Sequence, residues 1–142
     1  MYTNESLEQD MKSLSKTNKV DFALFIRPLI PSIIKALEPD EKLVGCSLSC
    51  QENGKSGFLL LFQNRIIFQE KFLARKRTEI YLKNIAAFEN NTIPIPFFSY
   101  DLCNIKITDA GGNKYLFTNL LDSDANRIIK VLNEQTVNQK AI

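Results

Sequence analysis

Hydrophobic residues near the start of the chain recur at the spacing of a helix. Leu7, Met11 and Leu14 lie four and then three residues apart, which puts them on one face of a helix over residues 4–15. Asn4 belongs to the residue types that cap helices. We therefore expect a short amphipathic helix that begins near Asn4.

Prolines divide the next helical stretch. An apolar run follows Val20, and Pro28 should bend or end that helix because proline removes a helix hydrogen bond. Pro31 is of a type favoured in the first helical turn. A third short helix is therefore expected to begin at Pro31 and to end at Pro39-Asp40.

From Glu41 to Leu121 the pattern changes to that of β-strands. In residues 42–51 every second side chain is apolar, which predicts that Val44, Cys46, Leu48 and Cys50 share one face. Turn residues such as Asn53-Gly54 and Gly111-Gly112 separate the apolar runs. The predicted strands cover residues 42–51, 58–62, 65–72, 77–82, 85–91, 97–108 and 114–120.

A helical period returns at the end of the chain. Asp122 or Ser123 is a suitable N-cap for this helix. Its apolar stripe comprises Ala125, Ile128, Ile129 and Leu132. The chain then ends in a polar tail.

Seven short antiparallel strands followed by one amphipathic helix is the order of the pleckstrin-homology (PH) superfold. The segment LEPDEKL at 37–43 resembles the L-x-P-x-E-x-(I/L) entry of bacterial PH-like domains. Residues 57–68 resemble their G-x-L-x-L-T-N-x-R-L-I-F hairpin, with Gln63 in place of Thr. Residues 79–85 resemble their x-I-P-L-x-x-I bend, with Tyr81 in place of Pro. The last hairpin is similar too, and the whole is most like the YokE-like type.

The resemblance implies an α+β, mainly β, fold. We expect a PH-like seven-stranded antiparallel barrel capped by a C-terminal helix and preceded by N-terminal helices. Residues 1–36 would form the helical extension, residues 37–135 the bacterial PH-like domain and residues 136–142 the polar tail.

Basic residues cluster on two predicted turns, at Lys55 and at Lys71, Arg75, Lys76 and Arg77. In a PH-like fold these turns should lie near the open end of the barrel, where each basic residue contributes about 1 kcal/mol of attraction to an anionic membrane. The phosphoinositide pattern of eukaryotic PH domains is missing, since the second strand carries no charge. The alternative is a solvated charged turn.

The second predicted strand is apolar at every position, namely Phe58, Leu59, Leu60, Leu61 and Phe62. Because side chains alternate between faces, both faces of this strand must be covered. The N-terminal helices could cover the outer face. The alternative is an interface with a protein partner or a second copy, through Phe58, Leu60 and Phe62 or through Leu59 and Leu61.

The segment from Thr92 to Tyr100 is apolar and contains Pro94 and Pro96. It could be a binding edge or a wedge that touches a membrane. The alternative is an ordinary edge connection in which the prolines block further strand pairing.

Cys46, Cys50 and Cys103 are an odd number of cysteines. Four residues along a strand span roughly 13 Å, so Cys46 and Cys50 cannot form a disulfide. Reduced, buried cysteines suit a cytoplasmic protein. The first 19 residues lack the apolar core of a signal peptide, and no apolar run is long enough to span a membrane.

Composition argues against several classes of function. Among 142 residues there is no His, which removes the commonest general base and metal ligand. Asp122 and Asp124 are paired carboxylates, but their place at a helix start marks them as caps. With 18 Lys and Arg against 16 Asp and Glu, the net charge of +2 makes nucleic acid an unexpected partner.

We therefore predict a non-enzymatic binding or self-association module with no catalytic residue, cofactor or metal. The alternative is peripheral attachment to an anionic membrane through the basic loops.

Overall fold

The computed structural model describes residues 1–17, 21–72, 75–96 and 100–140, with side chains up to residue 135. The N-terminal part contains α1 (Asn4–Leu14), η1 (Phe22–Ile26), η2 (Arg27–Leu29) and α2 (Ile30–Ala36). The strands are β1 (Leu43–Glu52), β2 (Lys55–Phe62), β3 (Arg65–Glu70), β4 (Arg77–Tyr81), β5 (Ile85–Ile93), β6 (Leu102–Asp109) and β7 (Lys114–Leu121). The short η3 (Leu82–Asn84) leads into β5, and α3 (Asp122–Lys140) ends the described chain.

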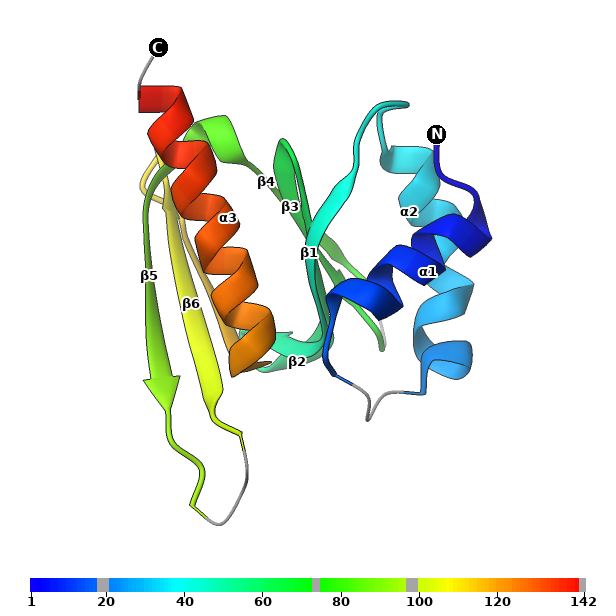
Figure 1. The fold of residues 1–142 in the computed structure, drawn as a ribbon, viewed down its shortest axis with the longest axis horizontal. Helices are drawn as coiled ribbons and strands as arrows, with labels where there is room; N and C mark the ends of the chain where they lie inside the picture. Colours follow the sequence, from blue (N-terminus) through cyan, green and yellow to red (C-terminus); the bar gives the residue numbers. More distant parts are fainter. Residues whose placement is uncertain (18–20, 73–74, 97–99, 141–142) are drawn as a thin grey trace.

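The strands form one antiparallel sheet in the order β4-β3-β2-β1-β7-β6-β5. Helix α3 packs on the inner face of the bent sheet, while α1 and α2 lie on the opposite side of β1–β4 (Figure 1). This confirms the expected α+β class, a seven-stranded antiparallel sheet with a C-terminal helix and N-terminal helices, and is consistent with a PH-like fold. No helix in the described part of the chain is long and apolar enough to cross a membrane.

Two apolar cores lie on the two faces of the sheet. The inner core joins α3, through residues such as Ile128 and Leu132, to Leu59, Leu61 and Phe117. The outer core joins the N-terminal helices to the other face of β1–β3. Its members are Leu7, Met11, Phe22, Ile26, Leu29, Ile30, Ile33, Leu43, Cys46, Leu48, Phe58, Leu60, Phe62 and Ile67.

The apolar strand β2 is therefore covered on both faces by the chain itself. Phe58, Leu60 and Phe62 point to the outer core, whereas Leu59 and Leu61 point to the inner core. All five side chains are buried. The expectation of an exposed interface on either set is thus wrong for this structure, because the helical extension supplies the cover that the strand needs.

Strand β1 does not keep one apolar face, contrary to the sequence expectation. Its pairing with β2 shifts register between Leu43 and Gly45 and again between Ser47 and Cys50. An extra residue at a bulge turns the following side chains to the other face. Cys46 and Leu48 consequently lie in the outer core, while Cys50 lies in the inner core with Val44 packed against it.

The N-terminal helices differ slightly from their predicted bounds. Thr3, not Asn4, caps α1, and it forms a capping box with Ser6. The stretch after Asp21 is divided where Pro28 enters η2, as expected, and α2 begins at Ile30 with Pro31 in its first turn. Short helices interrupted in this way can follow the curved outer face of the sheet.

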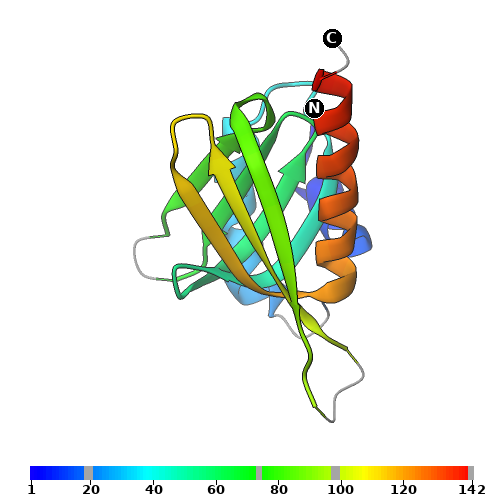
Figure 2. The ribbon, with the colours of Figure 1, turned by 90° about the vertical axis from the view of Figure 1, so that its left-hand side faces the viewer.

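Strands β5 and β6 form a hairpin. Its first strand is longer than the sequence pattern indicated, since β5 continues to Ile93. The hairpin extends below the rest of the sheet (Figure 2). Pro94 and Pro96 follow β5 directly and are exposed. The predicted sixth strand begins at Leu102 rather than at 97, and residues 97–99 lie outside the described residues.

Candidate functional site

The five basic residues singled out in the sequence do not form one site. Arg75 and Lys76 are exposed and make no ion pair among the described residues. Lys55 is also exposed, but its ammonium lies 3.7 Å from Glu70. The side chains of Lys71 and Arg77 form hydrogen bonds within the fold. Only part of the predicted anion-binding set therefore faces solvent.

Lys71 is buried, which corrects the expectation that it belongs to a solvated or membrane-facing turn. Its Nζ donates a hydrogen bond of 2.9 Å to the carbonyl of Leu48, at the bulge of β1. Burial lowers the pKa of Lys71, and the Cys50 thiol nearby opposes that shift. This lysine ties β3 to β1 and cannot reach a ligand at the surface.

Arg77 likewise serves the fold. Its Nε donates to Gln69 Oε1 at 2.9 Å, and one terminal nitrogen donates to Ser32 Oγ at 2.9 Å. The side chain thereby connects α2 with the edge of the sheet. An anionic ligand would have to compete with these contacts.

Exposed hydrophobic side chains are found at Phe72, three residues before Arg75, and on η1, which contacts Phe72 through Phe25. The Phe72 ring is 46% exposed and meets the ring of Phe25 edge-on, with their centroids 4.9 Å apart. Leu24, beside Phe25, is 62% exposed. The backbone N–H of Arg75 donates to the carbonyl of Phe72 at 3.2 Å. We call Leu24, Phe25, Phe72, Arg75 and Lys76 the apolar–basic patch.

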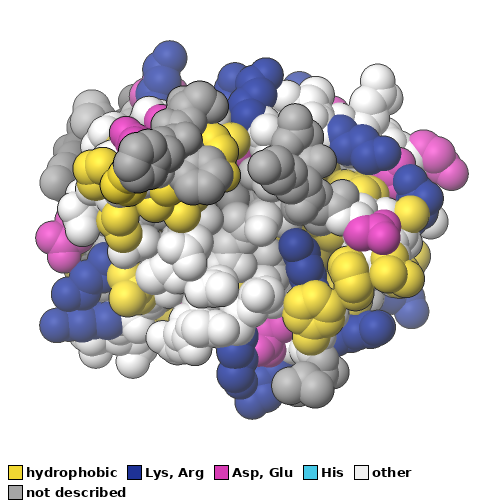
Figure 3. Space-filling model, turned by 90° about the horizontal axis from the view of Figure 1, so that it is seen from below, with side chains coloured by type: hydrophobic (Ala, Val, Ile, Leu, Met, Phe, Trp, Pro, Cys, Tyr) yellow, Lys and Arg dark blue, Asp and Glu magenta, His cyan; other side chains and the backbone are white. Residues whose placement is uncertain are grey.

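The segments that carry this patch, η1 and the end of β3, lie at the lower end of the fold as drawn in Figure 1, which is also the end where the β5–β6 hairpin protrudes. Seen from below, hydrophobic side chains gather in two areas of this face, with Lys and Arg side chains around and between them (Figure 3). After β5, Pro94 and Pro96 are exposed, and Ile95 between them is half-buried. The segment that the sequence suggested as a wedge thus lies on the same end as the apolar–basic patch.

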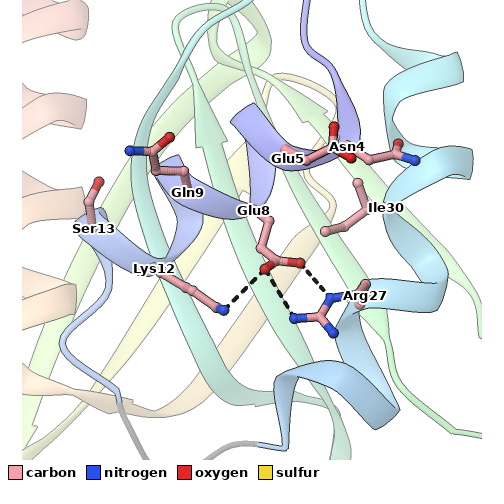
Figure 4. Close-up of a pocket in the computed structure, with 8 residues that line it drawn as sticks. All are labelled: Asn4, Glu5, Glu8, Gln9, Lys12, Ser13, Arg27 and Ile30. Atoms are coloured by element: carbon pink, nitrogen blue, oxygen red, sulfur yellow. Dashed lines mark hydrogen bonds and ion pairs between the residues drawn. The ribbon is translucent and has the colours of Figure 1, made fainter.

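A hollow of about 690 Å³ lies between α1 and the η2–α2 segment. Glu8 lies at its centre and accepts hydrogen bonds from Arg27 at 2.6 Å and from Lys12 at 3.1 Å (Figure 4). These bonds, chiefly that from Arg27, lower the pKa of Glu8 to about 2. Because Glu8 already pairs with both cations, an anion in this hollow would have to compete with its carboxylate.

A second hollow of about 410 Å³ opens where β1 and β7 separate. The two strands pair only at Gln51–Thr118 and Glu52–Phe117. The hollow carries charges of both signs, from Lys16 and Asp122, together with hydroxyl, amide and apolar groups. It is lined by Lys16, Thr17, Ser49, Tyr100, Leu102, Asn119, Leu121, Asp122 and Ser123.

The buried carboxylate of Asp124 lies close to this opening but is fully engaged. It accepts hydrogen bonds from Ser15 Oγ at 2.8 Å, from the Lys16 N–H at 2.7 Å and from Thr17 Oγ1 at 2.9 Å. The sequence indicated a helix cap for this residue. Its observed partners instead belong to the end of α1 and the segment after it, so Asp124 fastens the N-terminal extension to α3.

None of the three cysteines has the properties of a reactive site. Cys46, Cys50 and Cys103 are free and buried. Burial raises the pKa of Cys50 to about 12 and the pKa of Cys46 well above its ordinary value. Within the described residues, no group of three His, Cys, Asp or Glu side chains is arranged to hold a metal ion.

The sequence analysis missed Leu24 and Phe72 as surface residues. Leu24 lies in an apolar run and Phe72 ends a predicted strand, and both features usually indicate core positions. The one available signal was the position of Phe72 in a run of basic residues, Lys71, Arg75 and Lys76.

No protein-family model matches this chain, and no curated protein matches it significantly. The likeness to bacterial PH-like domains therefore stays a prediction from the quoted residues.

Proposed function

We propose that this protein is a non-enzymatic, PH-like binding domain that attaches peripherally to anionic membrane surfaces through its apolar–basic patch. The compartment that we propose is the cytoplasm, where free cysteines stay reduced. This was the second of the two functions that the sequence suggested.

One observation carries the proposal, namely that the apolar–basic patch combines exposed Phe72 and Leu24 with exposed Arg75 and Lys76, which form no ion pair among the described residues. Peripheral membrane binding combines apolar side chains that enter the headgroup region with cations that attract anionic lipid. The Phe25–Phe72 contact links two elements far apart in the sequence, so it presents the exposed ring from a supported position. Binding to a protein partner would not require this combination of exposed hydrophobic and exposed basic side chains.

The structure leaves less support for the other function that the sequence suggested, self-association through β2. Both faces of that strand are packed within the chain. An enzyme is also poorly supported, since the sequence has no His and the thiols of Cys46 and Cys50 have raised pKa values.

Co-sedimentation with vesicles tests the proposal. The wild type should bind vesicles that contain phosphatidylserine at low salt and bind neutral phosphatidylcholine vesicles less. Replacing Arg75 and Lys76 by Ser should cost about 1 kcal/mol per residue, or roughly a thirtyfold loss of affinity. Replacing Leu24 and Phe72 by Ser should weaken binding roughly tenfold or more, because part of the apolar transfer energy is lost.

A matched control is available on β7, where Leu116 is 43% exposed and Lys114 is exposed. The variant Lys114→Ser/Leu116→Ser should bind like the wild type. The proposal is refuted if the wild type does not bind anionic vesicles at low salt, or if the control loses as much affinity as the patch variants.

A further inference from the structure

The two edges of the sheet differ in how well they are protected. Strand β4 is only five residues long and carries Arg77 and Glu79, and Arg77 is tied to Ser32 of α2. Short, charged edge strands resist pairing with another chain. The opposite edge, β5, is nine residues long and pairs only with β6 in the sheet.

Strand β5 lacks the usual protections against edge pairing. Between Ile85 and Ile93 there is no Pro, Lys or Arg, and Glu89 is the one charged residue. Ala86, Ala87 and residues 89–92 are exposed. Helix α3 packs against β1, β6, β7 and η3. Figure 1 shows β5 at the outer margin of the fold.

We propose that β5 is a self-association edge, on which the β5 strands of two copies pair antiparallel around a two-fold axis at Asn90. Two identical strands can satisfy each other's free backbone groups, and a two-fold contact closes without leading to a filament. The result would be one continuous sheet across the dimer. This inference does not depend on membrane binding.

The charge pattern disfavours one register and is compatible with the register proposed. Side chains that lie directly opposite each other must point to the same face of the sheet. The register can therefore shift only in steps that keep each side chain on its own face. A pairing centred on Glu89 would put two like charges directly opposite, which is unfavourable. A pairing centred on Asn90 instead puts Glu89 opposite Asn91 and Phe88 opposite Thr92.

The first test measures the molar mass of the full chain by sedimentation velocity over a range of concentrations. We expect a reversible dimer for the wild type. Asn90→Lys puts two lysines opposite each other at the axis and should shift the protein to monomer. Asn126→Lys is the matched control, because Asn126 is exposed on α3 and receives the same change of charge. Circular dichroism would verify that both variants are folded.

The second test fixes the register by crosslinking. Opposite residues of an antiparallel pair have Cα atoms about 4.5 to 5.5 Å apart, within the range that a disulfide spans. Because the native cysteines are buried, Asn90→Cys should give a disulfide-linked dimer under mild oxidation and Asn126→Cys should not.

A wild type that is monomeric at every concentration overturns the proposal. So does a dimer that persists in Asn90→Lys, or a dimer in which Asn90→Cys forms no crosslink, because either result would put the interface elsewhere.

Discussion

The two faces of the sheet are covered by helices that are held in different ways. On the inner face one continuous helix, α3, follows β7 directly and packs through apolar residues such as Ile128 and Leu132. On the outer face the cover is divided among α1, η1, η2 and α2, which precede the sheet in the chain. The outer cover therefore has to be positioned by contacts that are distant in sequence.

Polar side chains supply much of that positioning. Arg65 joins β3 to Glu41 and to the carbonyl of Ala36 at the end of α2. Asp124 holds the segment after α1, and Tyr2 accepts a hydrogen bond of 2.9 Å from the Leu43 N–H. Apolar packing is not directional, whereas hydrogen bonds fix one orientation. A cover made of short helices gains a defined position from such bonds, and the long α3 needs fewer of them.

The largest expected effect comes from breaking the buried ion pair of the outer cover. Arg65 Nε and a terminal nitrogen lie 3.0 and 2.7 Å from the two oxygens of Glu41, and both side chains are almost fully buried. Arg65→Ala leaves the Glu41 carboxylate buried without this partner, which typically costs about 3 to 5 kcal/mol. Chemical denaturation would measure the loss in the free energy of unfolding.

Arg127→Ala is the control for this loss, because Arg127 is exposed on α3. It should change stability by less than about 0.5 kcal/mol. A similar small change for Arg65→Ala would contradict the importance of the ion pair. Restoring stability in Glu41→Met/Arg65→Met would show that the cost of Arg65→Ala comes from the stranded charge.

This ion pair also shows what the sequence could predict. Glu41 and Arg65 both belong to the segments that resemble bacterial PH-like domains, and local patterns predicted the strands around them. Their contact spans 24 positions and follows from how α2 meets β3, which no local period reveals. The succession of strands along the chain and the closing helix were predictable because they depend on local periodicity. The contacts that orient the outer cover were not.

The predictions for Lys71 and Cys50 are wrong for the same reason. A lysine beside Phe72 in a basic run has the pattern of a solvated turn, yet the carbonyl of Leu48 at the β1 bulge accepts its hydrogen bond. The bulge itself puts Cys50 on the inner face. Alternation of residue types does not reveal where a strand accommodates an extra residue. The exposure of Leu24 and Phe72 likewise depends on how η1 packs against the end of β3.

A smaller effect is expected when the connection between the two covers is removed. Asp124 lies on α3, and its three donors lie at Ser15, Lys16 and Thr17. Asp124→Ala leaves these donors without their charged acceptor, and we expect a loss of about 2 kcal/mol. Hydrogen exchange should increase more in α1 than in the sheet, because α1 loses its fixed end.

Asp122→Ala tests whether this effect depends on the contacts or only on charge at the start of α3. Asp122 lies in the same helical turn, but its side chain accepts a hydrogen bond from the N–H of adjacent Ser123. Asp122→Ala should therefore leave hydrogen exchange in α1 unchanged. Equal acceleration in both variants would mean that helix-end charge, rather than the Asp124 contacts, holds α1 in place.

The smallest effect lies within the outer cover, at the ion pairs of Glu8 with Arg27 and Lys12. The pKa of Glu8 is lowered from 4.5 to about 2, so the folded protein binds this proton less readily than the unfolded chain. The stabilisation is therefore fully present above the ordinary pKa and is lost as the pH falls towards about 2. Because the pairs face solvent, we expect at most about 1 kcal/mol. Urea unfolding of wild type and Glu8→Gln across this pH range should give curves of unfolding free energy against pH that converge at the acid end.

Glu5→Gln removes the same charge from the same helix at an exposed position, and its curve should stay parallel to that of the wild type. Convergence of both variants would assign the pH dependence to the overall charge of α1 and not to the bridge between α1 and η2.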